Sequence, residues 1–465
     1  MKTKYSSHNR ERGSALLIAV VISGLLIVLL ASYLDLLSAD NKSTVRSQQW
    51  NLSMPVVEAG IEEALAHINQ NATTNLLVPQ NLAPTLLTDG WQSENGAAVM
   101  RRSLTTGRYV VSIIVGTNGR TMTIDSVGYF PNLAAATTPG FIAAAGVGTQ
   151  NSELSRAVRV TTTNIPIFIK ALLVKKTLTS NGNAAFADAF DSSDPRYSTN
   201  GQYIASKATD GGGIATLSGA ANAINFGSAT VYGPVATGPG GSISTNSWTI
   251  GSHAWQAANP GKHVQPGWLT SDLNVNLPPV QAPTGGGAPA GGTVGGVVYD
   301  YILSSGNYQI GTGAFKGKVL VTGNATLYVT SGAAVNFSSS DSIVIQPGAS
   351  LNLYVGSASA TLPNVVNTTT ADKFTYFGLP TNTKLVQNVN ANFIGNIYAP
   401  NADYTLGGNG TGSEQKILGA AVINSMNYND TFTFHYDAVL GSLGLSRGVV
   451  VSTWDEISPT VALAK

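Results

Sequence analysis

The chain has 465 residues with a formal net charge of +1, and only 11% of them are charged. This near-neutral balance excludes an electrostatic surface for nucleic acid, so we expect no nucleic-acid partner. The absence of cysteine excludes disulfides, cysteine-type zinc sites and thiol chemistry. A surface rich in Gly, Asn, Ser and Thr is instead typical of exported, β-rich proteins.

A long apolar segment opens the chain. The residues from Ser14 to Leu34 include neither charge nor proline, and a helix of that length spans the roughly 30 Å of a bilayer core. Candidate signal-peptidase sites are poor, because Ala31 and Ala39 are each preceded two positions earlier by leucine. A retained membrane helix is therefore favoured over a cleaved secretory signal.

Basic residues precede the apolar segment. Lys2, Lys4, Arg10 and Arg12 are offset only by Glu11. The positive-inside rule predicts a cytoplasmic N-terminus and translocation of the remainder, as in a single-pass membrane protein.

The junction between these two parts is Arg12-Gly13-Ser14. A short basic leader that ends in glycine and is followed by an apolar helix resembles the prepilin leader of type IV pilins and type II secretion pseudopilins. The resemblance implies cleavage between Gly13 and Ser14 by prepilin peptidase, and N-methylation of Ser14. The apolar helix would be kept and would later pack into the core of a filament.

The sequence after the membrane segment strengthens this resemblance. In "MPVVEAGIEEALAHINQ" the apolar residues Val57, Ile61, Leu65 and Ile68 recur at helical spacing. The segment resembles the one that follows the membrane helix in PilX-like minor pilins. We expect the helix to continue here, with a kink or interruption at Pro55.

Most pilins have Glu at the fifth mature position, which in this chain is Ile18. In that family the carboxylate is thought to pair with the amine of the subunit ahead of it in the filament. A subunit without the acid suits a position with no subunit ahead of it, and the tip-forming K-type pseudopilin also lacks the acid. The alternative is that the chain enters no filament and Ile18 faces lipid.

The next region alternates like a small antiparallel sheet. "RYVVSIIV", "TMTIDSVGYF" and "SRAVRVTTT" have the pattern of strands, and residues 117–120 have the composition of a hairpin turn. A long helix on a small sheet is the pilin architecture that the resemblance implies.

An eight-residue period marks the large C-terminal region. Apolar pairs begin at Val319, Leu327, Val335, Ile343 and Leu351, with turn residues between them. Short strands that turn every eight residues predict a right-handed parallel β-helix of about 24 residues per rung, with a β-sandwich as the alternative.

The fold class is thus mainly β with a long N-terminal helix. We expect a leader at 1–13, a transmembrane or assembly helix at 14–37, its amphipathic continuation at 38–71, a small antiparallel region at 72–165, a β-helix at 166–445 with a Pro/Gly-rich loop or linker at 277–296, and a C-terminal tail at 446–465.

Residues that could support chemistry are scattered. Asp188, Asp191 and Asp194 lack the spacing of a calcium loop and are interpreted as a surface turn. The histidines His253, His263 and His435 have no paired spacing. The G-x-S-x-G match at residues 444–448 precedes an apparent strand, whereas a nucleophile elbow needs a helix. The aromatic residues Tyr398, Tyr404, Tyr428, Phe432, Phe434 and Tyr436 are compatible either with a carbohydrate-stacking strip or with the core of the last rungs.

We therefore predict no catalytic residue, cofactor or metal site. The sequence favours a minor pilin-like or pseudopilin-like protein that displays a β-helix at or near a filament tip, for assembly initiation or adhesion. The expected partners are the inner membrane, prepilin peptidase, other pilin subunits, and a surface or a glycan. The alternatives are a membrane-anchored carbohydrate-active enzyme and a static cell-envelope protein with an uncleaved anchor.

Overall fold

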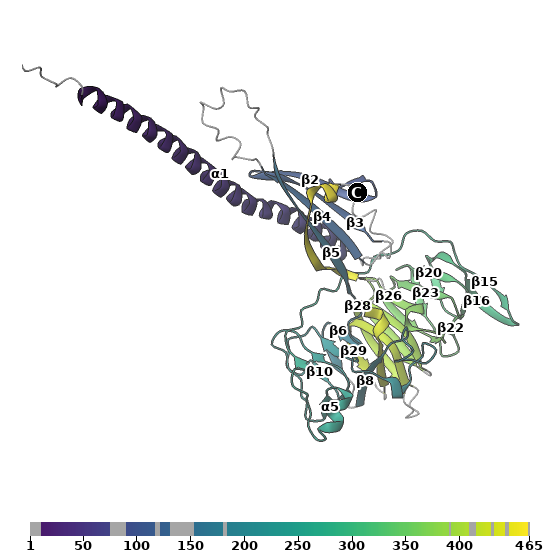
Figure 1. Ribbon diagram of the computed structural model, residues 1–465. Helices are drawn as coiled ribbons and strands as arrows, with labels where there is room; N and C mark the ends of the chain where they lie inside the picture. Colours follow the sequence, from purple (N-terminus) through teal and green to yellow (C-terminus); the bar gives the residue numbers. More distant parts are fainter. Residues whose placement is uncertain are drawn as a thin grey trace, which may run out of the picture.

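A computed structural model of the chain describes residues 11–74, 90–116, 121–130, 153–179, 184–389, 392–408, 415–428, 432–441 and 446–463. The described part contains one long helix, a small antiparallel sheet and a large parallel β-helix (Figure 1). The expected hairpin turn at residues 117–120 lies outside the described residues.

Helix α1 (Glu11–Thr74) is 64 residues long and therefore extends about 96 Å. Its first half has almost no tertiary contact, and its second half packs on the sheet. The prediction of an interruption at Pro55 was wrong, because the helix continues through it. Proline removes only one N–H donor, and the packing of Val56 and Val57 immediately beyond it keeps the segment helical.

The antiparallel sheet accepts the amphipathic half of α1 on one face. Its strand order is β1-β2-β3-β4-β5-β31, so the last strand of the chain lies beside β5 at the edge of the sheet. On the opposite face, the short helix α6 (Pro459–Leu463) packs Ala462 near Val127 and Ala157. The strands are β1 (Gln92–Glu94), β2 (Ala97–Leu104), β3 (Gly107–Val115), β4 (Thr121–Phe130), β5 (Leu154–Pro166) and β31 (Ser446–Ile457).

The β-helix has three faces, which we call A, B and C, and neighbouring strands on each face are parallel. Face A, in spatial order, consists of β17 (Gly306–Ile310), β20 (Asn324–Val329), β23 (Ser350–Val355), β26 (Phe374–Gly378), the middles of β28 (Phe393–Gly408) and β29 (Gln415–Tyr428), β6 (Leu172–Val174), β9 (Ile214–Thr216), β12 (Val235–Ala236) and β14 (Leu269–Thr270). Face B consists of β18 (Gly313–Phe315), β21 (Ala333–Asn336), β24 (Ser359–Leu362), β27 (Lys384–Val389), the ends of β28 and β29, β7 (Leu178–Thr179) and β10 (Ile224–Asn225). Face C consists of β16 (Val297–Leu303), β19 (Lys318–Val321), β22 (Ser342–Ile345), β25 (Asn364–Asn367), the starts of β28 and β29, β30 (Phe432–Asp437), β8 (Ala184–Phe190), β11 (Ser228–Val231) and β13 (Trp248–Ile250). An additional strand, β15 (Ala290–Val294), pairs antiparallel with β16, and helix α5 (His253–Ala258) follows β13.

The eight-residue period produces this geometry as predicted. Val319, Leu327 and Val335 lie on successive faces and are all buried in one core. One full turn brings Lys318 beside Ser342, 24 residues later. Because the strands of each face pair in parallel, the parallel β-helix is confirmed and the β-sandwich alternative is excluded.

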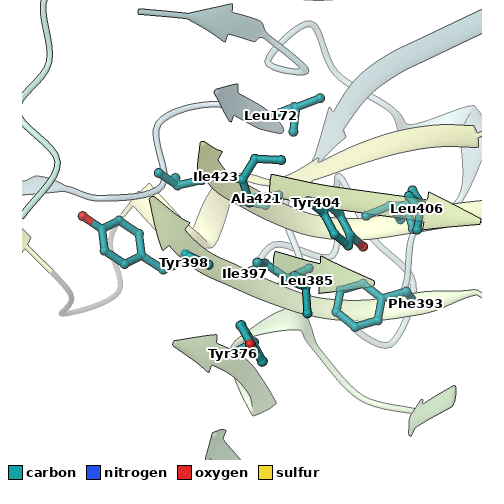
Figure 2. Close-up of a cluster of buried hydrophobic side chains, with 14 of the residues drawn as sticks. Leu172, Tyr376, Leu385, Phe393, Ile397, Tyr398, Tyr404, Leu406, Ala421 and Ile423 are labelled. Carbon is teal, nitrogen blue, oxygen red and sulfur yellow. The ribbon is translucent and has the colours of Figure 1, made fainter. Parts of the chain in front are cut away.

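The β-helix is built from two legs that meet at a seam. The chain enters at β6, and residues 172–270 form the first leg; residues 290–437 form the second leg. At the seam β6 pairs with β29 and β8 pairs with β30, although these strands are about 250 residues apart in sequence. Figure 2 shows Leu172 of β6 above Ala421 of β29 and Ile397 of β28, so one core continues through the seam.

The Pro/Gly-rich segment joins the two far ends of the β-helix. This strap, residues 271–289, starts where Leu273 N donates to Thr237 O in the first leg. It passes Tyr398, whose hydroxyl donates to Pro278 O at 2.8 Å, and buries Val280. It ends where Gly287 bonds with Asn307 and Gln309 of β17. The expected loop or linker at 277–296 thus includes most of this strap, together with β15.

The small sheet joins the β-helix at a neck about two-thirds of the way from β17 to β14. The chain leaves β5 at Pro166 and returns at Ser446, and these two residues are cross-strand partners. Residues 446–465 were expected to be a tail, but residues 446–457 form β31 of the sheet and residues 459–463 form α6, which packs on it. Figure 1 shows the β-helix lying across the end of the sheet like a crossbar, with α1 extending away on the opposite side. From β17 to β14 the crossbar has nine strand-to-strand steps of about 4.8 Å, or about 43 Å in total.

Candidate assembly surface

The first half of α1 is an exposed apolar surface. From Ala15 to Leu36 every described side chain is exposed, and Ile18 is 56% exposed. The helix is long and apolar enough to cross a membrane by length and composition. Exposed apolar area of this extent is unstable in water and requires a lipid or protein partner.

The leader residues lie at and beyond the start of this helix. Arg12, Gly13 and Ser14 belong to the first residues of α1. Lys2, Lys4 and Arg10 fall outside the described residues. The cleavage and methylation expected at Gly13 and Ser14 therefore stay predictions.

Close packing fixes the second half of α1 on the sheet. Gly60 lies where α1 comes nearest to β4, and a Cβ built there would be 2.4 Å from Ser126 Oγ. Ser126 Oγ in turn donates to the carbonyl of Val57 at 2.8 Å. Gly128 gives the same clearance from the β4 side, because a Cβ there would be 2.8 Å from Val57 Cγ2. Helix α1 can approach β4 this closely only because both positions lack a side chain.

Charged groups beside this core are paired. Arg159 binds Asp125 through two contacts of 2.7 Å, and Asp125 is only 2% exposed. Glu63 of α1 accepts hydrogen bonds from Arg102 and from the Tyr109 hydroxyl. Burial of Tyr109, reinforced by the negative charge of Glu63, raises the pKa of this phenol to about 12. The contacts of Glu63 join α1 to β2 and β3, whereas the Arg159–Asp125 pair links β5 to β4 within the sheet.

The end of α1 is tied to the neck. Asn69 accepts a hydrogen bond from Val449 N at 2.8 Å and donates one to Val449 O at 3.3 Å. A Cβ at Gly448 would lie 2.6 Å from Asn69 Oδ1, and Gly448 has φ of 145°. The amide of Asn69 therefore acts like an additional backbone partner at the edge of β31.

The aromatic residues considered for a stacking strip are core residues instead. All six are at most 8% exposed. Figure 2 shows Tyr404 among inward-facing residues of the β-helix, whereas Tyr398 points to the side where the strap covers it. Tyr436 donates from its hydroxyl to Phe168 O at the neck. Of the two interpretations left open by the sequence, the structure supports packing.

The three histidines and the carboxylate cluster do not form a common site, and each residue makes its own local contacts. His435 is buried at the seam, with Nδ1 against Asp188 and Nε2 3.0 Å from the Thr433 hydroxyl. His253 contacts Asp210 near α5, and His263 Nδ1 lies 3.0 Å from Trp248 O. Within the described residues, no group of three or more His, Asp and Glu side chains could hold a metal ion.

The interpretation as a surface turn was wrong for Asp188, which is buried at the seam. Asp191 and Asp194 do form a turn, as the sequence suggested. Asp191 accepts from the backbone N–H and hydroxyl of Ser193, and Asp194 pairs with Arg196. Ser446 of the G-x-S-x-G match belongs to strand β31, and no helix of the nucleophile-elbow kind follows it. Because this serine lies in a strand, the match is not a nucleophile elbow.

Sequence reasoning missed Asp437, a fully buried acid at the end of β30. Its Oδ1 accepts from Ser192 N at 2.9 Å, whereas Oδ2 is buried without a hydrogen-bond partner among the described residues. Desolvation raises the pKa of this carboxyl above its ordinary value, and the nearby charge of Asp191 adds a smaller contribution in the same direction. No spacing pattern marks such a residue in the sequence.

This acid predicts a specific pH dependence. Because the pKa of Asp437 is higher in the folded than in the unfolded chain, ionisation costs folded-state stability, and the loss begins as pH rises above the unfolded value near 3.9. We expect the free energy of unfolding of wild type, relative to Asp437→Asn, to fall as pH rises from about 4 to the folded-state pKa, by about 1.4 kcal/mol for each unit of pKa difference. Urea unfolding at several pH values measures this. Parallel pH curves for the two proteins would contradict it.

One part of the chain matches a known protein family. Residues 291–443 match a family model described as a domain of unknown function (DUF7305). The match covers almost all of the second leg of the β-helix. It includes neither the first leg nor the small sheet. No curated protein matches the chain significantly.

Among solved structures, the competence-associated pilin ComZ from Thermus thermophilus is similar at 11% sequence identity. The alignment covers 87% of this chain and 96% of that chain, with a TM-score of 0.23. A TM-score this low supports no conclusion about fold or function.

Proposed function

We propose that the protein is a minor pilin-like or pseudopilin-like subunit that is processed between Gly13 and Ser14 and displays its β-helix at or near a filament tip. The observation that carries the proposal is the division of α1 into two halves. The exposed apolar half is suited to a membrane and then to a bundle of similar helices, while the other half is built into the sheet. Prepilin peptidase and other pilin-type subunits are the partners that this processing and packing require.

The crossbar supports a terminal position. The neck joins the β-helix between its two ends, so the crossbar extends to both sides at the end of the sheet that faces away from the apolar half of α1 (Figure 1). A body about 43 Å long in that place obstructs a further subunit stacking beyond it. The absence of an acid at Ile18 favours the same position, because a subunit with none ahead of it has no neighbouring amine to neutralise.

The N-terminus of the native protein tests this proposal. Mass spectrometry of the protein isolated from its own membranes is expected to show a chain that starts at Ser14, N-methylated. A Gly13→Leu variant, which leaves the basic residues and the apolar segment unchanged, should retain Met1 and should not leave the membrane. A wild-type chain that retains Met1 would indicate a static anchor, and a start near Asp40 would indicate ordinary secretion.

A further inference from the structure

Face B of the β-helix presents one outward-pointing residue on each of seven consecutive strands. This face-B strip follows printed cross-strand partners from rung to rung and passes through the seam without a break. In spatial order it consists of Asn336, Thr361, Val386, Thr405, Asn427, Thr179 and Asn225. Every member is exposed or half-buried, whereas the residues before each of them along the strand are buried. Six steps of about 4.8 Å make the strip about 29 Å long.

The strip lies away from the neck. The chain enters the β-helix just before β6 on face A and leaves just after β30 on face C, so the neck is at the corner between these two faces. Face B is the remaining face, opposite that corner. If the protein is displayed as proposed above, this face is the one directed away from the filament.

With the exception of Thr179, the polar side chains of the strip do not stabilise the β-helix through hydrogen bonds among the described residues. Asn and Thr ladders can stabilise stacked strands by bonding to one another, and one polar pair on each of the other two faces bonds in this way. Ser350 Oγ donates to Asn324 Oδ1 on face A, and the hydroxyls of Thr249 and Thr230 are 3.3 Å apart on face C. Among the described residues, the only side-chain hydrogen bond from the face-B strip is that of Thr179 to Met426 O.

The chemistry of the strip selects a class of ligand. It offers amide and hydroxyl groups, which both donate and accept hydrogen bonds, in a straight row with no charge. Val386 is its only apolar member, which is too little for the apolar centre of a protein interface. The adjacent column has Lys384 on one rung and Asp403 on the next, so it provides no net attraction for a polyanion.

We propose that the face-B strip binds an extended, uncharged polysaccharide lying along the axis of the β-helix. The rung spacing is comparable with the length of one sugar residue, so successive rungs can contact successive sugars through the same kind of hydrogen bond. Each contact is weak, and the length of the strip supplies avidity. The proposal rests on the display function above for its biological use, although binding itself can be measured independently.

The test uses the full chain in detergent, pelleted with microcrystalline cellulose, with chitin powder, or with calcium alginate beads as an acidic comparison. We expect wild type to be retained by at least one of the two neutral polymers and not by alginate. The triple variant Thr361→Ala/Thr405→Ala/Asn427→Ala should lower the retained fraction at subsaturating polymer by at least about tenfold, because it removes three neutral hydrogen bonds.

A matched variant controls for nonspecific retention. Asn307→Ala/Thr326→Ala/Asn352→Ala removes the same kinds of groups from three neighbouring rungs of face A and should bind like wild type. The single variant Thr405→Arg, which places a long charged side chain mid-strip, should also lose binding while keeping the circular dichroism spectrum of wild type.

Each remaining outcome overturns the proposal: no retention by either neutral polymer, equal loss in the face-A control, unchanged retention of the face-B variants, or retention by alginate alone. Failure here is separable from failure of the display function. A chain starting at Ser14 without polysaccharide binding removes only the strip proposal, and an intact Met1 with binding removes only the pilin-type assignment.

Discussion

A Gly60→Leu variant is expected to keep its β-helix and lose the packing of α1 on the small sheet. The new side chain would start 2.4 Å from Ser126 Oγ and 3.0 Å from Tyr109 Cδ2. Ser126 cannot turn away without giving up its bond to Val57 O, so α1 must rise from the sheet. Overpacking of a close contact costs about 1–3 kcal/mol, and a bulky side chain at this position should reach at least the upper end.

Hydrogen exchange followed by mass spectrometry on the detergent-solubilised chain measures this. Peptides from β3 and β4 should lose protection, while peptides from β20 and β23 keep it. Gly24→Leu is the matched control, because a Cβ at Gly24 meets nothing within 4 Å. Unchanged protection of β4 in the Gly60 variant would show that the helix does not depend on this clearance.

Truncation after Leu440 is expected to destabilise the small sheet, although only the last residues of the chain are removed. Strand β31 covers the edge of β5 from Ser446 to Ile457, and Val449 belongs to the core under α1. Its loss also removes the partner of Asn69 and the Glu456 carboxylate bound by Arg156. Because β5 would then be an exposed edge strand beside a smaller core, we expect it to unfold locally.

Limited trypsin digestion reports this opening. Cleavage after Arg156 and Arg159 on β5 should become rapid in the truncated chain, while the β-helix stays resistant. A chain that ends at Ile457 keeps all of β31 and loses only α6, so it should be cut slowly, as wild type is. Equal resistance of both truncated chains would mean that β31 is dispensable for the sheet.

The β-helix was predictable because its core repeats at short range. Two inward residues every eight positions, such as Val319 and Val321, are determined by the alternation of side chains along a strand and by the length of one side of the coil. The amphipathic half of α1 was predictable for a similar reason, since Val57, Ile61 and Ile68 mark one helical stripe.

The seam and β31 were not predictable in the same way. Leu172 of β6 pairs with Ala421 of β29 because the edge strands of the two legs meet in the folded protein. No local sequence pattern predicts which edge strands will pair. The segment from Ser446 onward has the alternation of a strand, but its partner β5 is separated from it by the whole β-helix. The buried acid Asp437 depends on the turn at Ser192, which lies across that same seam.

The residues of the face-B strip lie in ordinary strand patterns of the sequence, and hydrophobic periodicity alone does not distinguish them from other outward-facing residues. Thr405 stands between the buried residues Tyr404 and Leu406, and Asn427 stands between Met426 and Tyr428. Each triplet alone is an ordinary strand. Alignment of such triplets into one row requires the rung-to-rung register, which the structure supplies.

The position of the neck determines how the protein would respond to pulling. Because β5 and β31 both enter the β-helix at one end of the sheet, tension between the β-helix and a held α1 is shared by two adjacent strands. The force on β5 runs along the strand, and the hydrogen bonds that join it to β4 from Thr121–Thr163 to Phe130–Leu154 are perpendicular to it. These bonds are then sheared together rather than opened one after another. A body attached in this way resists tension applied along these strands.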